Sequence, residues 1–130
     1  MILGSFCAAV GKRKSSTARV LMRLGSGLFF INNIYFFRYF TSVTTRMLIN
    51  EVLCAFNYLV FDIFVTLNGG GICGQVLALR LALCRCLCVY DSRFVSVFKS
   101  MGFLNYDSRV VERKKIGFVK SRKRKQFSKR

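Results

Sequence analysis

The sequence predicts a mixed α/β domain of two layers, followed by an extended basic tail. Runs rich in β-branched and aromatic residues alternate with segments whose apolar residues recur at helical spacing, and such elements need two layers to bury their apolar faces. Hydrophobic residues make up 53% of the 130-residue chain, and half of all Lys and Arg lie in residues 109–130. We therefore expect an N-terminal segment over residues 1–10, a domain over residues 11–117 and a tail over residues 118–130.

The first half of the domain predicts a hairpin, a helix and a strand. Two β-rich runs within residues 16–32 flank a GSG turn, whose glycines tolerate positive φ, so we expect these runs to pair with each other. After an aromatic segment, residues 44–56 show apolar residues at helical spacing and predict a helix. Residues 61–67 are rich in Val, Ile and Phe and end before a glycine, which predicts a strand.

The second half predicts two helices and a last strand. Residues 75–90 (QVLALRLALCRCLCVY) combine leucine-rich periodicity with the absence of any helix breaker, and give the clearest helix of the chain. Residues 93–101 predict a shorter helix that ends at Gly102. Residues 109–119 mix charges with Val and Ile and are interpreted as a final strand.

The charge balance points to a polyanionic partner. Twenty-two cations face five acids, and the net charge of +17 cannot be neutralised within the chain. Membrane insertion is not expected, because residues 52–67 are too short to span a bilayer and include Asp62, and residues 28–40 are shorter still. The apolar start precedes its cations, the reverse of a secretory signal, so no targeting segment is expected. A nucleic acid is therefore the favoured partner.

The cysteines predict no metal site and no cofactor. Cys84, Cys86 and Cys88 are spaced by two, unlike the spacing of structural zinc sites, and histidine is absent from the chain. The six cysteines are interpreted as small buried apolar residues in a reducing compartment.

The glycines at residues 69–74 spell GxGxxG between a predicted strand and a predicted helix. Dinucleotide binding would also require an acid at the end of a second strand about twenty residues on, and this acid is missing. Two readings remain: a tight turn from strand to helix, or a turn whose free N–H groups meet an RNA phosphate. No catalytic set is recognised elsewhere, so the chain is not expected to be an enzyme.

Two basic segments favour contact with phosphates. GKRKSSTARV at residues 11–20 combines cations with hydroxyls, the usual phosphate-contacting groups, although a solvated arm is the alternative. ERKKIGFVKSRKRKQFSKR at residues 112–130 repels itself and gains order by neutralising phosphates. Its phenylalanines, Phe118 and Phe127, could stack on a base or fill a protein pocket.

In one order along residues 11–130, the segments GKRKSSTARV, GSG, FIN, NGGGICGQ, DSRVVERKKIG and QFSKR closely resemble the bacterial-type small-subunit ribosomal protein of universal family nine. The resemblance implies a two-layer α/β sandwich like the second domain of ribosomal protein family five, with a left-handed crossover. It implies a structural protein in the head of the subunit whose partners are small-subunit rRNA, peptidyl-site tRNA and neighbouring ribosomal proteins. It implies neither a homo-oligomer nor insertion into a membrane.

By position, the resemblance assigns two sets of contact residues. The tRNA-contacting set is Arg130, Lys129, Ser128 and Phe127. The rRNA-binding set is Lys12, Arg13, Lys14, Ser15, Gly69, Gly70, Gly71, Gly74, Gln75, Arg113, Lys114, Lys115, Lys120, Arg122, Lys123 and Arg124.

Two departures qualify the resemblance. Lys125 stands where the family usually has a proline, which removes a φ constraint and adds a charge. The helix at residues 75–90 is more apolar than in relatives, either because it meets an additional protein or because the sequence drifted under codon bias.

The absence of proline and the fourteen phenylalanines suggest an AT-rich organelle genome, with a mitochondrion slightly favoured over a plastid. The rival functions are a small nucleotide-binding enzyme that uses GGGICG and a basic peripheral membrane protein.

Overall fold

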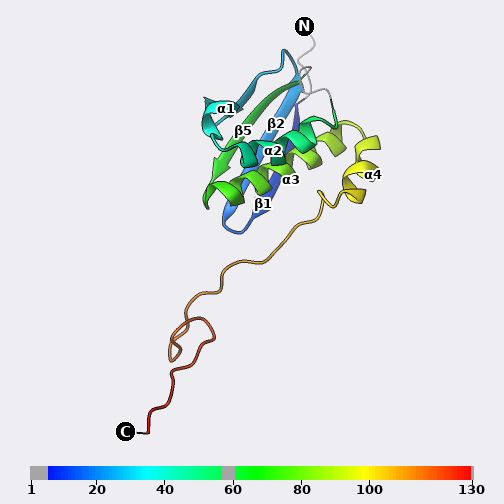
Figure 1. Ribbon diagram of the computed structural model, residues 1–130. Coiled ribbons are helices and arrows are strands. Elements are labelled where there is room, and N and C mark those ends of the chain that lie inside the picture. Colours follow the sequence, from blue (N-terminus) through cyan, green and yellow to red (C-terminus); the bar gives the residue numbers. More distant parts are fainter. Residues whose placement is uncertain (1–5, 57–60, 130) are drawn as a thin grey trace.

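A computed structural model describes residues 6–56 and 61–129. It contains a five-stranded sheet of order β1-β2-β5-β3-β4, helices that cover one face of this sheet, and an extended C-terminal arm (Figure 1). The predicted mixed α/β class is confirmed. The elements in chain order are β1 (Cys7–Arg13), β2 (Ser16–Leu24), β3 (Phe29–Ile31), β4 (Ile34–Tyr35), α1 (Phe36–Tyr39), α2 (Val43–Leu53), β5 (Phe61–Asn68), α3 (Ile72–Tyr90) and α4 (Arg93–Ser100).

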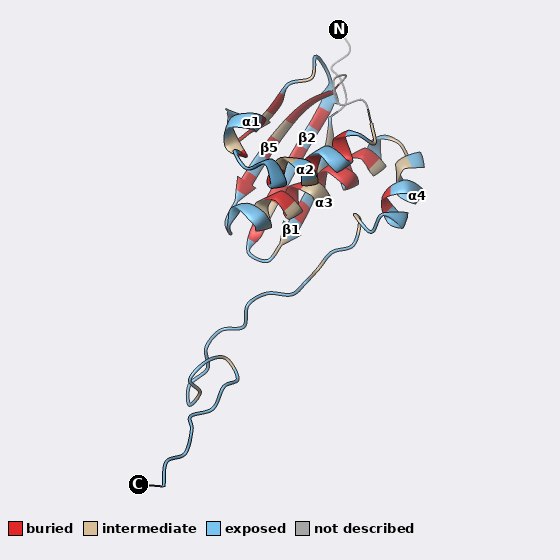
Figure 2. Ribbon diagram, in the orientation of Figure 1, coloured by how far each residue is buried: buried red, intermediate tan, exposed pale blue. Residues whose placement is uncertain are grey.

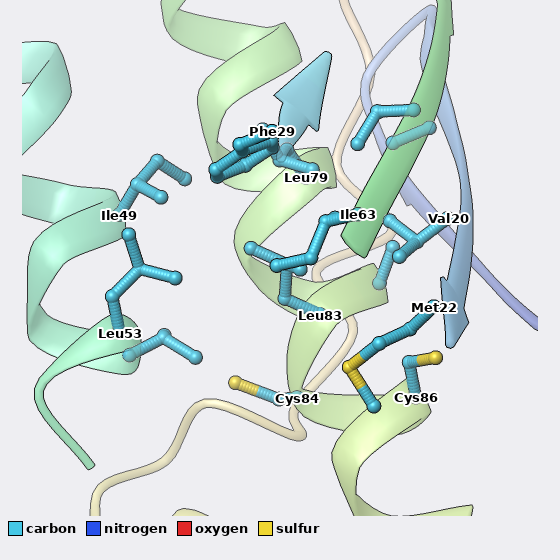
Figure 3. Packing of buried hydrophobic residues seen from close by; sticks show 14 of the residues in the cluster. Val20, Met22, Phe29, Ile49, Leu53, Ile63, Leu79, Leu83, Cys84 and Cys86 are labelled. Carbon is cyan, nitrogen blue, oxygen red and sulfur yellow. The ribbon is translucent and has the colours of Figure 1, made fainter. Parts of the chain in front are cut away.

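The core lies between the sheet and the helices. Along β2, burial alternates from residue to residue, and Ala18, Val20 and Met22 face the helices. Each fully buried aliphatic side chain of this kind contributes about 1.5–3 kcal/mol to folding. Figure 3 shows side chains that meet between the layers: Val20, Met22, Phe29, Ile49, Leu53, Ile63, Leu79 and Leu83.

The close contact between β1 and α3 depends on a glycine. A Cβ atom added to Gly11 would lie 2.1 Å from the carbonyl oxygen of Ala78 and 2.7 Å from the amide nitrogen of Ala82. Backbone therefore packs directly on backbone here, where any other residue would force the helix away. The strand that contains Gly11 begins at Cys7, before the start of the domain expected at residue 11.

The predicted pairing of the two runs in residues 16–32 is wrong. Both strands form, but β2 pairs with β1 and β5, and β3 pairs in parallel with β5, which lies between them. The carboxylate of Asp62 at the start of β5 holds the connection in place, because it accepts hydrogen bonds from the backbone N–H of Ser26 (2.9 Å) and of Leu28 (3.2 Å). The glycine-containing turn thus crosses over the start of β5 and does not form a hairpin between β2 and β3.

The predicted helices and the strand at residues 61–67 are confirmed as α2, α3, α4 and β5. The strand predicted over residues 109–119 is wrong, since this stretch contains only one residue of an isolated bridge, between Phe118 and Arg124. Its apolar side chains find no surface to cover, and Ile116 is 96% exposed. A strand needs a neighbour to pair with, and the arm leaves the domain without passing along the sheet (Figure 1).

The hydropathy of α3 follows from its central position. By length and composition alone this helix could cross a membrane, but half of its most apolar window is buried inside the domain. It packs against β1, β2, α2 and α4. A helix enclosed on several sides must be apolar around most of its circumference, so burial accounts for its composition.

The six cysteines differ in burial, and Cys7 and Cys88 are partly buried. Cys84 and Cys86 of α3 are buried as expected, and burial raises the pKa of both thiols to about 12 because a thiolate would lose its hydration. Cys54 and Cys73 are exposed, so the expectation of burial is wrong for them. Cys54 follows the last turn of α2 and Cys73 lies in the first turn of α3, both at element ends that face solvent.

Candidate nucleic-acid interface

Two of the basic or glycine-rich segments singled out in the sequence meet at one end of the sheet. Lys14 and Ser15 form the turn between β1 and β2, and Lys14 adopts a left-handed conformation with φ of 52°. The glycine loop, residues 69–71, joins β5 to α3 directly beside this turn. Segments more than fifty residues apart in the chain therefore form one surface.

The glycines allow the loop to touch the turn. A Cβ atom on Gly70 would lie 1.9 Å from the hydroxyl oxygen of Ser16, and one on Gly69 would lie 2.6 Å from the carbonyl oxygen of Ser15. Gly69 and Gly70 also have positive φ values of 71° and 64°, which L side chains rarely adopt. The Ser16 hydroxyl donates to the carbonyl oxygen of Gly69 (3.2 Å), so this buried serine ties turn and loop together.

The predicted RNA-binding residue Gln75 holds the same loop from the other side. Its side-chain amide donates to the carbonyl oxygen of Gly69 (3.2 Å), and its side-chain oxygen accepts from the hydroxyl of Tyr39 (2.9 Å). Sequence reasoning did not identify the roles of Tyr39 and Ser16, because both bonds join residues far apart in the chain. Gln75 thus shapes the loop, and the loop carries the surface.

The first turn of α3 attracts anions. Gly71 is the N-cap residue and supplies no side-chain hydrogen bond, and the first turn contains no acidic residue. The amide groups at such a helix start lack acceptors and carry the positive end of the helix dipole. Lys12 and Lys14 on the adjoining hairpin are exposed and form no ion pair with the residues that the structure describes. These groups together can hold a phosphate.

Arg13, also predicted to contact RNA, fastens the arm to the domain. One terminal nitrogen of its guanidinium donates to the carbonyl oxygens of Asp107 (3.4 Å) and Arg109 (3.3 Å). The other lies 3.0 Å from the carboxylate of Asp107. Hydrogen bonds from Arg109, followed by the charge of Arg13, lower the pKa of Asp107 below its ordinary value, so this carboxylate stays ionised.

Beyond this junction the described arm is exposed except at Phe118 and Ser121, which are partly buried (Figure 2). Glu112 pairs with Arg122, which lowers the pKa of the Glu112 carboxyl and holds a small loop. Just after that loop, the Arg124 guanidinium lies 5.9 Å from the ring centre of Phe118. The predicted rRNA-binding cations of the arm all face solvent: Arg113, Lys114, Lys115, Lys120, Arg122, Lys123 and Arg124.

The tip of the arm lies far from the surface formed by turn and loop (Figure 1). Phe127 is 99% exposed, and Lys129 is also exposed. Arg130, predicted to contact tRNA, lies outside the described residues. The structure thus brings together the hairpin turn and the glycine loop, but it does not bring the arm cations to them.

Within residues 6–56 and 61–129, no group of three or more His, Cys, Asp or Glu could hold a metal ion.

A comparison with known protein families gives one match. The family model described as ribosomal protein S9/S16 matches residues 11–130, nearly the whole chain.

Proposed function

The chain belongs to the ribosomal protein S9/S16 family, and we propose that it binds small-subunit rRNA through two cationic surfaces and peptidyl-site tRNA through its tip. As a member of this family it is a structural, non-enzymatic constituent of the small ribosomal subunit that acts in translation. The family binds rRNA and other ribosomal proteins. Membership gives no support to a nucleotide-binding enzyme or to a peripheral membrane protein.

The observation that carries the proposal is the exposed arm. Residues 109–130 hold eleven cations and one acid, and Glu112 is already paired with Arg122. Self-repulsion of this kind is relieved when each cation neutralises a phosphate and releases a condensed counterion. The arm is extended and carries its cations outward, which suits a segment that follows an RNA backbone in the head of the subunit.

The second rRNA surface is the end of the domain. Lys12, Lys14 and Ser15 provide charged and hydroxyl donors, and the first turn of α3 adds backbone N–H groups. Donors of these types contact phosphate oxygens and fix the position of a protein on the nucleic acid without reading its sequence. This surface would orient the domain, while the arm extends away from it.

The tRNA contact is assigned to residues 127–130. Lys129 and Arg130 supply two charges for phosphates, and the exposed ring of Phe127 supplies a surface for a base or a neighbouring protein. Arg130 is included although it lies outside the described residues. The assignment follows the family resemblance by position, and the described end of the arm lies far from the domain (Figure 1).

We further propose that the ribosome in question belongs to an organelle, with a mitochondrion favoured over a plastid. The absence of proline and the abundance of phenylalanine fit an AT-rich organelle genome. Cofractionation of the chain with small subunits from purified mitochondria supports this location, and cofractionation only with plastid or cytoplasmic ribosomes excludes it.

The tRNA proposal is tested with small subunits assembled with the full chain or with a chain that lacks residues 128–130. The truncated chain should still assemble, because the missing residues lie outside the domain. Peptidyl-site tRNA should dissociate about tenfold faster, as expected for the loss of two charge-assisted phosphate contacts. Lys99→Gln, which removes an exposed cation of α4, is the control and should leave tRNA release unchanged. Equal tRNA release from both kinds of subunit, across a salt series, contradicts the proposal.

A further inference from the structure

We propose that the open face of the sheet is a separate RNA-binding surface, which holds unpaired nucleotides by stacking their bases on a row of aromatic side chains. The proposal rests on the RNA partner inferred above but concerns a surface that neither the arm nor the glycine loop includes. The helices that cover the sheet, α2 and α3, lie on its other face, and α4 packs against α3 (Figure 1). The open face is thus available to a partner without any rearrangement of the core.

The strand register places one apolar or aromatic side chain from every strand in a single row across this face. Ala8 pairs with Leu21, and Leu21 pairs with Phe64. Phe64 pairs with Phe30, and Phe30 pairs with Tyr35. Neighbouring strands lie about 4.8 Å apart, so the row forms a continuous platform.

Three aromatic rings lie next to one another in this row. Phe30 and Phe64 lie nearly parallel, with ring centroids 6.3 Å apart and an angle of 11° between their planes. Tyr35 meets Phe30 edge to face at 5.8 Å and is 45% exposed. Phe30 and Phe64 are themselves partly exposed. Contiguous exposed apolar side chains on a small domain mark an interaction surface.

Arginines border the row on both sides. The Arg23 guanidinium lies 5.5 Å from the ring centre of Phe64 and 5.7 Å from that of Phe6. Arg19 lies on the opposite side of the row, between Val10 and Thr66, and makes no hydrogen bond or ion pair with any residue that the structure describes. Arg19 is thus placed to meet a phosphate that flanks a stacked base, whereas the Arg23 guanidinium already pairs with the Asp62 carboxylate (3.3 Å).

The face offers no free carboxylate among the described residues of its strands. Asp62 is 4% exposed, and its oxygens accept hydrogen bonds from Ser26, Leu28 and Arg23. An acidic peptide could also meet the arginines. The aligned aromatic row, however, matches the flat faces of bases, and sheets that present aromatic side chains between cations are a recurrent platform for single-stranded RNA. Duplex RNA hides its base faces, so the platform should select unpaired segments.

The test uses the full chain and a single-stranded RNA of about ten nucleotides, with an RNA duplex of the same length as the second probe. The variant Phe30→Leu with Phe64→Leu keeps the face apolar but removes its rings. It should lose about tenfold or more in affinity for the single strand, since stacking on an aromatic ring contributes about 1–3 kcal/mol per base. Affinity for the duplex should remain that of the unaltered chain. Tyr90→Leu, at the far end of α3, is the matched aromatic control and should change neither affinity.

Arg19→Gln keeps the test decisive if the double variant unfolds. This change touches no buried side chain, and it should lower the slope of log affinity against log salt by about 0.7 for the single strand only. Unchanged single-strand binding by a folded double variant, or by Arg19→Gln if the double variant unfolds, overturns the proposal. A failure of the unaltered chain to bind either RNA would instead count against the proposed function.

Photocrosslinking in the assembled subunit tests which partner occupies the face. Crosslinks from Phe30 or Phe64 to unpaired rRNA nucleotides support the proposal. Crosslinks from these residues to another ribosomal protein overturn it and assign the face to a protein contact.

Discussion

Phe98 in α4 and Phe127 in the arm have the same side chain, but they are 0% and 99% exposed. The same contrast separates Ile49, which is fully buried, from Ile116, which is 96% exposed. Removal of such side chains from water stabilises the domain from within. The arm buries almost nothing and carries a large excess of cations, so its order must come from a partner. The domain is therefore stabilised by its own packing, whereas under the proposed function the arm becomes ordered when it binds RNA.

The largest expected difference between the domain and the arm is in the loss of stability when one side chain of each is truncated. Leu83→Ala removes a fully buried side chain between α3 and the sheet, and should lower the free energy of unfolding by about 2–5 kcal/mol. Ile116→Ala in the arm should change it by less than about 0.5 kcal/mol. Urea unfolding followed by circular dichroism measures both. A comparable loss in the two variants would mean that the arm is part of the cooperative unit.

Removal of arm cations should have the opposite signature. The triple change of Lys114, Lys120 and Lys123 to Gln should lower affinity for an rRNA fragment by about ten- to a hundredfold, because each lost phosphate contact forgoes counterion release. The slope of log affinity against log salt should become shallower by about two to three. The unfolding free energy should not change. The control is Arg38→Gln with Lys99→Gln, which removes exposed cations from helices. An equal loss of affinity in this control would mean that net charge, and not the position of the arm cations, determines the affinity for RNA.

The contact between β1 and α3 leaves no room for a side chain at Gly11. Gly11→Ala should destabilise the domain by about 1–3 kcal/mol, because the new Cβ atom would meet the backbone of α3. Gly71→Ala is the matched control, since a Cβ atom there has no neighbour within 4 Å and the φ of −99° suits any residue. Thermal unfolding compares the two, and equal stabilities would contradict the tight packing of β1 on α3.

The smallest expected effect is acid sensitivity at Asp62. Hydrogen bonds from Ser26, followed by Leu28 and Arg23, lower the pKa of this carboxyl despite its burial. A lowered pKa in the folded state contributes stability that is present above the unfolded pKa and is lost as pH falls through the folded pKa. Asp62→Asn should therefore be less stable at neutral pH and lose less stability between about pH 6 and about pH 3. Glu51→Gln, at an exposed site on α2, should keep the acid response of the unaltered chain.

Local patterns in the sequence predicted α2, α3, α4 and β5 correctly, because periodicity and glycine boundaries lie within each of these segments. The short helix α1 was not predicted. The pairing of β2 with β3 was predicted wrongly, since the carboxylate that directs the chain elsewhere, Asp62, lies more than thirty residues away. β1 went unrecognised because CAAVGKR was divided between an apolar N-terminal segment and the basic segment that starts at Gly11, whereas its strand character comes from pairing with β2.

The candidate site was predictable in composition but not in geometry. The cations and glycines were identified from their types and order, and the structure joins the hairpin turn to the glycine loop as one surface. The bonds that build this surface, from Ser16 to Gly69 and from Tyr39 to Gln75, join distant residues and leave no local signal. For the same reason Arg13 read as a free cation, although it holds Asp107 at the base of the arm.

Hydrogen exchange of the full chain, with and without an rRNA fragment from the subunit head, tests the central claim most directly. The account predicts that amides of β2, β5 and α3 are protected in the free protein, and that residues 110–129 exchange rapidly until RNA is added. Protection of the arm in the free protein, or an arm that stays unprotected when RNA is bound, would contradict the account.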